Sequence, residues 1–192
     1  MLDLISSRVH ADALDILVAA FEDDHAVRCL YPDPDAYRAH FPGFALALGG
    51  RAFDGGLVDV DDGGAALWLA SGQEVDGAAL GAYLEATVPA ERREALAAGM
   101  ELQGSFHPEE PHWYLPWIGV RPEAQGRGLG AALLRRGLAR ADRDGLPAYL
   151  EATNRRNAAL YARHGFEALG TVEAPGYPEI IPMWRPATGT SN

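Results

Sequence analysis

Trp113-Tyr-Leu-Pro-Trp-Ile-Gly-Val120 is followed in the sequence by Arg121-Pro-Glu-Ala-Gln-Gly-Arg-Gly-Leu-Gly130, and this stretch decides the fold. Residues 113–120 are largely aromatic and β-branched, which predicts a buried strand. Proline cannot continue a hydrogen-bonded ladder, so Pro122 marks the end of that strand. After the glycines, leucines at positions 129, 133, 134 and 138 recur at helical spacing. The stretch therefore predicts a strand, a glycine-rich loop and a helix that starts on the loop.

The glycines within residues 126–130 suit a loop that binds phosphate. They let backbone N–H groups point at one spot, and the helix dipole adds partial positive charge there. The pattern Gly126-x-Gly128-x-x-Ala131 also fits the fingerprint of dinucleotide-binding proteins, with Glu151 at a suitable distance for the ribose-binding acid. The strand and the first glycine are too far apart for that motif, however, and too little chain follows for a doubly wound sheet. A dinucleotide site is therefore the weaker interpretation.

Two motifs carry a resemblance to a known family. Gln125-x-x-Gly128-x-Gly130, which follows a strand and opens a helix, resembles the acetyl-CoA signature of the GNAT N-acetyltransferase superfamily. Residues 149–154 (Tyr-Leu-Glu-Ala-Thr-Asn) and 157–166 (Asn-Ala-Ala-Leu-Tyr-Ala-Arg-His-Gly-Phe) resemble its second motif. Within the superfamily, three segments look closest to puromycin N-acetyltransferase and its relatives: His112-Trp-Tyr-Leu, Leu150-Glu-Ala-Thr and Tyr161-Ala-Arg-His-Gly-Phe. The resemblance covers residues 113–185 well and the N-terminal half only loosely.

This resemblance implies an α/β (α+β) fold with a mixed, strongly bent central sheet and helices on both faces. It implies one acetyltransferase domain over residues 1–187, with an acceptor-side half (1–111), an acetyl-CoA-binding half (112–187) and a frayed tail (188–192). The residue pattern predicts strands at 2–9, 113–120 and 148–152 and hairpins at 53–60 with 65–70 and at 166–172 with 180–184. It predicts helices at 12–21, 36–48, 76–100 with a break near Pro89, from 131 onward, and 155–164.

Composition excludes several classes of protein. The net charge of −11 disfavours a nucleic-acid partner, because an acidic surface repels phosphate backbones. All 16 basic residues are arginine, so neither a Walker-A lysine nor a Schiff-base lysine is present. The single cysteine, Cys29, allows no internal disulfide and no multi-cysteine zinc site, and we expect no metal. Without a leader or a long apolar run, we expect a cytoplasmic protein that does not bind membranes, as a monomer or homodimer.

The resemblance also implies which residues bind acetyl-CoA. The loop would hold the pyrophosphate, and the backbone of the central strand would pair with the pantetheine arm like an added strand. Two asparagines at the start of the following helix would hydrogen-bond the arm, although helix capping explains Asn154 almost as well. The expected contacts are Ile118, Gly119, Val120, Gln125, Gly126, Arg127, Gly128, Leu129, Gly130, Ala131, Asn154 and Asn157.

The family's reaction requires a base. An alkylammonium has a pKa of roughly 10, so a neutral amine is scarce at pH 7 and its proton must be removed. Glu151 is the first candidate, as a base or as an acceptor that holds a water, and an exposed strand-end acid is the alternative. Other members carry a glutamate on the central strand at the position of Tyr114. His112 shares the face of Tyr114 and is a further candidate, although a structural histidine is the stronger interpretation.

The reaction also requires an oxyanion donor and an acid. By resemblance, the donor is a backbone N–H near Val120. Tyr161 matches the family tyrosine that protonates the leaving thiolate, and a core tyrosine packed on Phe166 is the alternative. Six aromatic residues are candidates to line an apolar acceptor pocket, although most are expected in the core: Tyr31, Phe41, Phe44, Trp68, Phe106 and Trp117.

The sequence therefore predicts an acetyl-CoA-dependent N-acetyltransferase that acts on the amine of a small molecule. A non-catalytic module that binds or senses acyl-CoA is the main alternative, because Tyr114 stands where the family often keeps a carboxylate. An NADP-dependent oxidoreductase is the weaker alternative, and it depends on the dinucleotide fingerprint. Asp23 and Asp24 follow the first predicted helix and are either contacts for a cation or part of a solvated loop.

Overall fold

The computed structural model describes residues 2–189, with side chains from residue 8 onward. Its strands are β1 (Leu57–Asp61), β2 (Gly64–Leu69), β3 (Trp113–Val120), β4 (Ala148–Ala152), β5 (Glu167–Ala168) and β6 (Ile181–Arg185). They form one sheet in the order β1-β2-β3-β4-β6-β5. Only β3 and β4 run parallel, and each other neighbouring pair of these strands is antiparallel. Such a mixed sheet is not doubly wound, so the fold removes the basis for the dinucleotide site.

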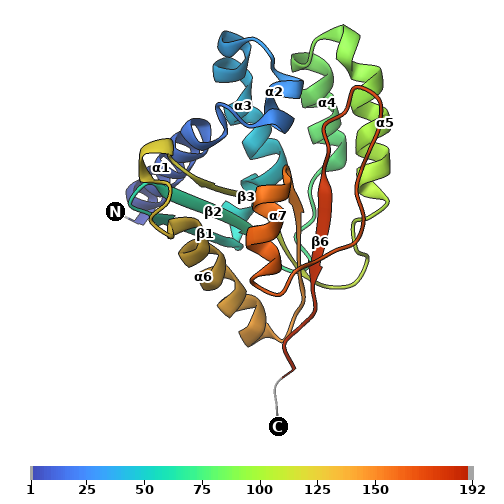
Figure 1. Ribbon diagram of the computed structural model, residues 1–192. Helices are drawn as coiled ribbons and strands as arrows, with labels where there is room; N and C mark the ends of the chain where they lie inside the picture. The colour runs from blue at the N-terminus through green and yellow to red at the C-terminus, as the bar shows by residue number, and fades with distance from the viewer. Residues whose placement is uncertain (1, 190–192) are drawn as a thin grey trace.

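Seven α-helices surround the sheet within the described residues (Figure 1). They are α1 (Leu2–Phe21), α2 (His25–Leu30), α3 (Pro34–Gly49), α4 (Gly77–Thr87), α5 (Arg93–Gly104), α6 (Leu129–Asp144) and α7 (Arg155–Ala162). Short 3-10 turns η1 (Gly50–Asp54), η2 (Ala90–Arg92) and η3 (Pro122–Ala124) join some of them. In Figure 1, β2 and β6 run in clearly different directions. The predicted fold, a mixed and bent sheet between helices, is confirmed.

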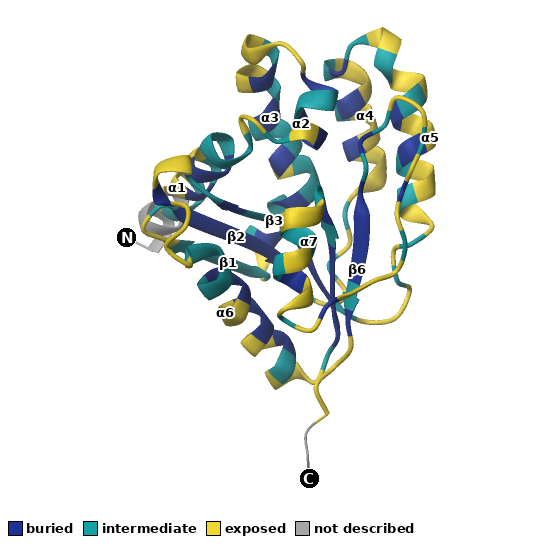
Figure 2. Ribbon diagram, viewed as in Figure 1, coloured by how far each residue is buried: buried dark blue, intermediate teal, exposed yellow. Residues whose placement is uncertain are grey.

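The two faces of the sheet carry separate cores. Alternate residues of a strand point to opposite faces, so Leu67 of β2 packs with Leu17 of α1 while Trp68 packs with Leu133 of α6. The α1-side core also takes in residues of α2 to α5, and the α6-side core takes in α7. Figure 2 shows β2 and most of β6 buried between the two layers, with exposed residues on the outer sides of the helices.

A β-bulge interrupts β3 where it passes the centre of the sheet. Leu67 of β2 pairs with Trp117, but Leu69 pairs with Tyr114, so β3 has one extra residue in between. The side chains confirm the bulge. In a regular strand Leu115 and Trp117, two residues apart, would point to the same face, but Leu115 lies in the α6-side core and Trp117 in the α1-side core. The bulge therefore reverses which residues of β3 face each side.

The two central strands part beyond this bulge. β3 and β4 pair only over Trp113–Leu115 with Ala148–Leu150. Beyond that point, among the described residues, β3 pairs with β2 and β4 pairs with β6. Two unpaired strand edges therefore face each other in the middle of the sheet, and we call the space between them the opening.

Most elements lie where the sequence predicted them, and the acceptor-side half holds the main differences. The strand predicted at residues 2–9 is wrong, because this segment is the first part of α1. The helical period continues through it into Ala13, Ile16 and Leu17, which are buried. Helix α2 was not predicted, and residues 53–56 lie outside the β1–β2 hairpin. The tail expected at 188–192 lies partly outside the described residues, and Thr188 donates a hydrogen bond to Asp142.

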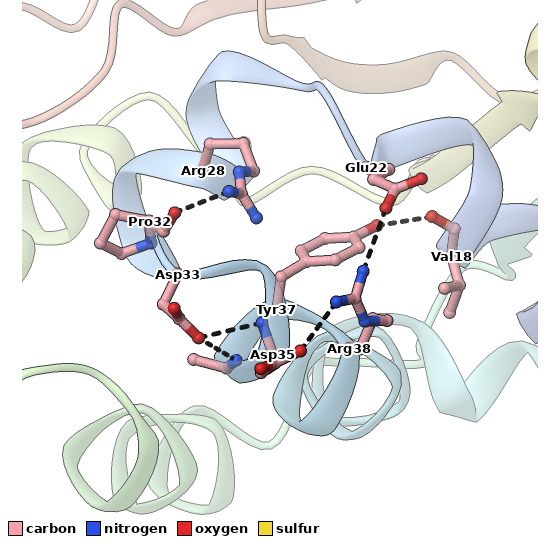
Figure 3. Close-up of polar contacts among 9 residues, drawn as sticks. Val18, Glu22, Arg28, Pro32, Asp33, Asp35, Tyr37 and Arg38 are labelled. Carbon is pink, nitrogen blue, oxygen red and sulfur yellow. Dashed lines mark hydrogen bonds and ion pairs between the residues drawn. The ribbon is translucent and has the colours of Figure 1, made fainter.

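Polar contacts fasten α1, α2 and α3 to one another (Figure 3). The Tyr37 hydroxyl on α3 donates to the Val18 carbonyl on α1 at 2.7 Å. Arg28 on α2 donates to the Pro32 carbonyl at 2.6 Å and lies over the Tyr37 ring. Arg38 pairs with Glu22 and with Asp35. This cluster fixes α2 against α1 and α3.

No helix within residues 2–189 is long and apolar enough to cross a membrane.

Candidate active site

The glycine loop, residues 125–130, joins η3 to the start of α6. Gly126 and Gly128 have φ angles of +75° and +82°, a region that side chains with a Cβ adopt only under strain. A Cβ atom at either glycine would meet nothing within 4 Å. The backbone conformation therefore requires glycine at these positions, and the loop stays open to solvent.

Free donors gather at this loop. The N–H groups of residues 126–131 donate no hydrogen bond to any part of the chain that the structure describes. Those of residues 129–131 are the unpaired donors of the first turn of α6, where the helix dipole also favours negative charge. The seven consecutive residues predicted to contact acetyl-CoA here, 125–131, are exposed or partly exposed. Arg127 lies 3.8 Å from Asp62, and both side chains remain largely exposed.

Alternation along β3 decides which backbone groups face the opening. The Arg121 N–H donates to the Gly63 carbonyl on the β2 side. Gly119 therefore also faces β2, whereas the N–H groups of Ile118 and Val120 face the opening. Gly119 has a different role, because a Cβ atom there would approach Ala20 of α1 to 2.7 Å. Of the three predicted strand contacts, Ile118 and Val120 thus turn their N–H groups toward the opening, and Gly119 does not.

Glu151 lies near the end of β4, at the edge of the opening. Its two carboxylate oxygens accept hydrogen bonds from the hydroxyls of Tyr114, at 2.7 Å, and Tyr149, at 3.1 Å. Burial raises the pKa of Glu151 above the usual value of a glutamate, and the hydrogen bond from Tyr114 opposes this shift. Burial also raises the pKa of Tyr114 well above its usual range. Tyr114 of β3 thus supports a carboxylate from the neighbouring strand, β4.

Tyr161 lies on the other face of the sheet. It is buried on α7 in the α6-side core, with its ring centroid 6.1 Å from that of Phe166. Burial, and secondarily the charge of Asp24, raises the pKa of Tyr161 well above its usual value. Among the described residues, none makes a hydrogen bond with its hydroxyl. Tyr161 therefore stays protonated at neutral pH and keeps its proton free for a ligand.

Asp24 links α2 to the open end of β4. Its side chain accepts the N–H groups of Ala26 and Val27 and caps α2. It also accepts a hydrogen bond from the Thr153 hydroxyl at 2.8 Å. Asp24 is therefore a helix cap and not part of a solvated loop. An aspartate directly before helix-forming residues is the signal that predicts such a cap.

The two predicted asparagines differ in whether their side chains already form hydrogen bonds within the protein. Asn154 caps α7, because its side-chain oxygen accepts the N–H of Asn157 at 2.8 Å. The Asn157 side chain has no hydrogen-bond partner among the described residues.

His112 lies just before β3. Its Nδ1 is 2.7 Å from the Glu110 carbonyl oxygen, and its ring packs against Tyr149. The structural interpretation of His112 agrees with these contacts.

Two cavities meet at Glu151. The inner cavity, about 120 Å³, lies between helices α2 to α5 and the sheet and is lined by Pro116, Trp117 and Thr153 at the opening. The outer cavity, about 590 Å³, is lined by the loop at 71–75, by Gly104 and by residues 107–112. Five residues line both: Leu48, Leu80, Met100, Gln103 and Glu151.

Only two of the aromatic candidates line the inner cavity. Phe44 and Trp117 do so, and their ring centroids are 5.5 Å apart. Tyr31, Phe41 and Trp68 are fully buried in the cores, as expected for most of the six. The inner wall also uses Tyr177, which the sequence analysis missed because it lies in the loop between β5 and β6. The Tyr177 hydroxyl donates to Gln103 at 2.6 Å.

Residues 64–166, more than half of the chain, match the model of the acetyltransferase (GNAT) family. The chain belongs to the GNAT acetyltransferase family. The matched region includes β3, the glycine loop, Glu151 and Tyr161. Its similarity to puromycin N-acetyltransferase in particular stays a prediction.

Curated relatives share only a short segment with this GNAT chain. A segment of 63 residues is 41% identical to mycothiol acetyltransferase from Streptomyces coelicolor, covering 31% of this chain and 20% of that protein. A segment of 58 residues is 34% identical to an uncharacterized N-acetyltransferase from Schizosaccharomyces pombe, covering 30% and 24%. The chain thus matches less than a third of each relative, and these names support an acyltransferase without indicating its substrate.

Solved structures match over nearly the whole chain. A structure described as histone acetyltransferase HPA2 and related acetyltransferase from Corynebacterium glutamicum is 31% identical, covers 95% of this chain and 93% of its own, and has a TM-score of 0.66. Arylalkylamine N-acetyltransferase 2 from Aedes aegypti is 13% identical, with coverage of 95% and 96% and a TM-score of 0.64. The second similarity shows the fold alone.

Proposed function

We propose that this GNAT protein transfers the acetyl group of acetyl-CoA to the amine of a small molecule. The observation that carries the proposal is that Glu151, bonded to Tyr114 and Tyr149 of the α1-side core, and Tyr161 of the α6-side core lie on opposite faces of the sheet. Attack of the amine on the thioester carbon forms the new N–C bond and breaks the C–S bond. One proton must leave the nitrogen and one must reach the thiolate, so a base and an acid are both needed. We propose residues 1–187 as one domain for this reaction.

Acetyl-CoA binding would use backbone more than side chains. The free N–H groups of residues 126–131 suit a pyrophosphate, and Gln125 braces the loop by donating from its side chain to the Val120 carbonyl at 3.1 Å. Arg127 lies in the same loop, so its guanidinium would add positive charge beside the pyrophosphate. The edge of β3 at Ile118 would pair with the pantetheine arm, and the free N–H of Val120 would lie beside the thioester. Asn157 is better placed than Asn154 to hydrogen-bond that arm, because the oxygen of Asn154 is already used by the helix cap.

Glu151 would accept the proton of the amine. Its raised pKa makes it a stronger base than an exposed glutamate, and it lines the cavity that ends at the opening. Tyr161 would protonate the thiolate from the other face. Its hydroxyl is protonated and unpaired among the described residues, which suits donation. The N–H of Val120 would hydrogen-bond the oxyanion.

The contact between Tyr114 and Glu151 weakens the non-catalytic alternative. That alternative depends on the missing carboxylate at position 114, but the hydrogen bond between the two residues places a carboxylate beside it. A binding module would have no need to keep a partly buried carboxylate with a raised pKa, because removing a charge from water costs free energy. The catalytic proposal therefore accounts for one more feature of the site.

Two measurements on the purified chain test this function. Acetyl-CoA, but not NADPH, is expected to raise the melting temperature, because a ligand stabilises the folded state that binds it. Thiol release from acetyl-CoA is then followed with a panel of small amines, and amine-dependent release is expected. A thermal shift with acetyl-CoA but no release with any amine would favour the binding module. A shift with NADPH alone would revive the oxidoreductase.

A further inference from the structure

The inner cavity carries one charged side chain. Besides Glu151, its lining is apolar or uncharged, with Val27, Leu30, Leu84 and Leu96 among the residues that form its walls. No arginine or histidine lines it, and the sequence contains no lysine. A ligand that fills this cavity therefore meets apolar surface everywhere except at one carboxylate.

That carboxylate has room for one more partner. A carboxylate has about four acceptor positions, and Tyr114 and Tyr149 occupy one on each oxygen. A hydrogen bond from the Gln103 side chain also lowers the pKa of Glu151, so one position remains. Tyrosine donates but brings no positive charge, and no salt bridge to Glu151 is present in residues 8–189. An ammonium group supplies both the charge and the donors that the carboxylate lacks.

A second charge on the ligand has no partner in the inner cavity. A carboxylate on the ligand would be buried without a cation, and a second ammonium would be buried without an anion, and either costs several kcal/mol in a protein interior. The outer cavity is lined by Glu74, Glu109 and Glu110 together with His107 and His112. It therefore attracts cations toward Glu151 and disfavours ligands that carry a carboxylate.

The size of the inner cavity sets the bulk of the ligand. A cavity of roughly 150 Å³ lined by aliphatic and aromatic side chains binds benzene, and the inner cavity measures about 120 Å³. One aromatic ring or a short branched chain therefore fits, and its amine would lie between Glu151 and the opening at Pro116 and Trp117.

We propose that the acceptor is a monoamine with one compact apolar group and no carboxylate, whose apolar group fills the inner cavity and whose nitrogen contacts Glu151. This proposal rests on the proposed acetyl transfer and narrows its substrate class. Selectivity against amines with a second charge would arise because the inner cavity offers no cation and no second anion to pair with that charge.

Two matched pairs of amines test the class. Phenethylamine differs from phenylalanine by a carboxylate, and hexylamine differs from hexamethylenediamine by a second amine. Each is assayed with acetyl-CoA for kcat/KM and by calorimetry for binding without turnover. We expect phenethylamine to exceed phenylalanine by about 100-fold or more in both measurements, because an unpaired charge is costly. Equal values for that pair, or a preference for the diamine over hexylamine, would overturn the proposal.

A pair of leucine variants places the apolar group. Leu84 is buried and lines the inner cavity, so Leu84→Trp fills it. We expect the KM for phenethylamine to rise about tenfold while acetyl-CoA affinity is unchanged. Leu46→Trp, at an exposed leucine on α3, is the control and leaves both unchanged. If Leu84→Trp folds poorly, Leu84→Ala serves instead and is expected to favour a naphthyl amine over a phenyl amine. An unchanged preference in both variants would contradict the assigned cavity.

The two readouts separate this proposal from the function on which it rests. Binding of phenethylamine over phenylalanine without thiol release would keep the ligand class and reject acetyl transfer. Thiol release with both at equal rates would keep acetyl transfer and reject the ligand class.

Discussion

The glycine loop and the inner cavity border the same opening in the sheet, but they are built from different parts of the chain. The loop is exposed, consists of consecutive residues and offers backbone N–H groups. The cavity is enclosed by side chains from α2, α3, α4, α5 and the sheet, and it offers one carboxylate. Under the proposed function, recognition of acetyl-CoA would depend on local backbone shape, whereas recognition of the amine would depend on long-range packing. Substitutions in the two regions should therefore separate cosubstrate affinity from turnover.

The largest expected effect is at Glu151. Glu151→Gln keeps the size of the side chain but removes the base, so turnover should fall by about 100-fold or more. The glycine loop is untouched, so the Kd for acetyl-CoA should stay within about twofold of wild type. Steady-state kinetics and calorimetry measure the two quantities, and Glu167→Gln on an exposed part of β5 is the control. Near-normal turnover in Glu151→Gln would contradict the role of Glu151 as the base.

Tyr161→Phe tests the opposite face of the opening. The hydroxyl is lost while the ring still packs near Phe166. We expect turnover to fall at least about tenfold with nearly normal acetyl-CoA affinity, since the general acid is removed. Tyr83→Phe, which removes a hydroxyl bonded to the His40 carbonyl, is the matched control. If Tyr161→Phe turns over at the wild-type rate, the tyrosine is structural.

Gly128→Ala tests the loop. The alanine has space, but a φ of +82° strains it by about 1–2 kcal/mol. If the loop moves to relieve that strain, acetyl-CoA affinity should fall by up to about tenfold, while the affinity for phenethylamine stays the same. Gly81→Ala in exposed α4 is the control and should stabilise the protein by about 0.5–1 kcal/mol. Thermal melts and calorimetry check both variants, and equal behaviour of the two would contradict the loop's special conformation.

The smallest expected effect is a shift in pH dependence. The hydrogen bond from Tyr114 lowers the pKa of Glu151 and so opposes the effect of burial. Tyr114→Phe removes this bond, so the pKa of Glu151 rises further and more of the carboxylate is protonated at a given pH. The acid limb of kcat/KM should therefore move to higher pH, by less than about one unit, with little change on the alkaline side. A shift to lower pH would contradict the assigned hydrogen bond.

The local parts of the site follow from the sequence. The bounds of β3 and β4 agree with prediction because each strand is a short apolar run ended by a turn or cap, at Pro122 and Asn154. The glycine loop was found for a similar reason, since its conformation requires glycine at fixed spacing. The cap at Asn154 was also foreseen.

The non-local parts do not follow. The bond between Tyr114 and Glu151 joins residues 37 positions apart, and it depends on the pairing of β3 with β4. Tyr177 reaches the cavity because Gly99 of α5 leaves space for its ring, which a Cβ atom would meet at 2.1 Å. No periodicity encodes either contact. The start of α1 was wrong because polar residues between apolar ones resemble a strand over a short window.

The separation of strands β3 and β4 also affects how readily the protein could aggregate. Unpaired strand edges are templates for aggregation and strand swapping. Here both edges lie inside the sheet, with β2 and β6 on their outer sides, so a foreign strand must enter between them to pair. A cosubstrate arm that lies along β3 would occupy the same edge. By mass action, the supply of acetyl-CoA would then set both the rate of acetylation and the lifetime of the folded chain.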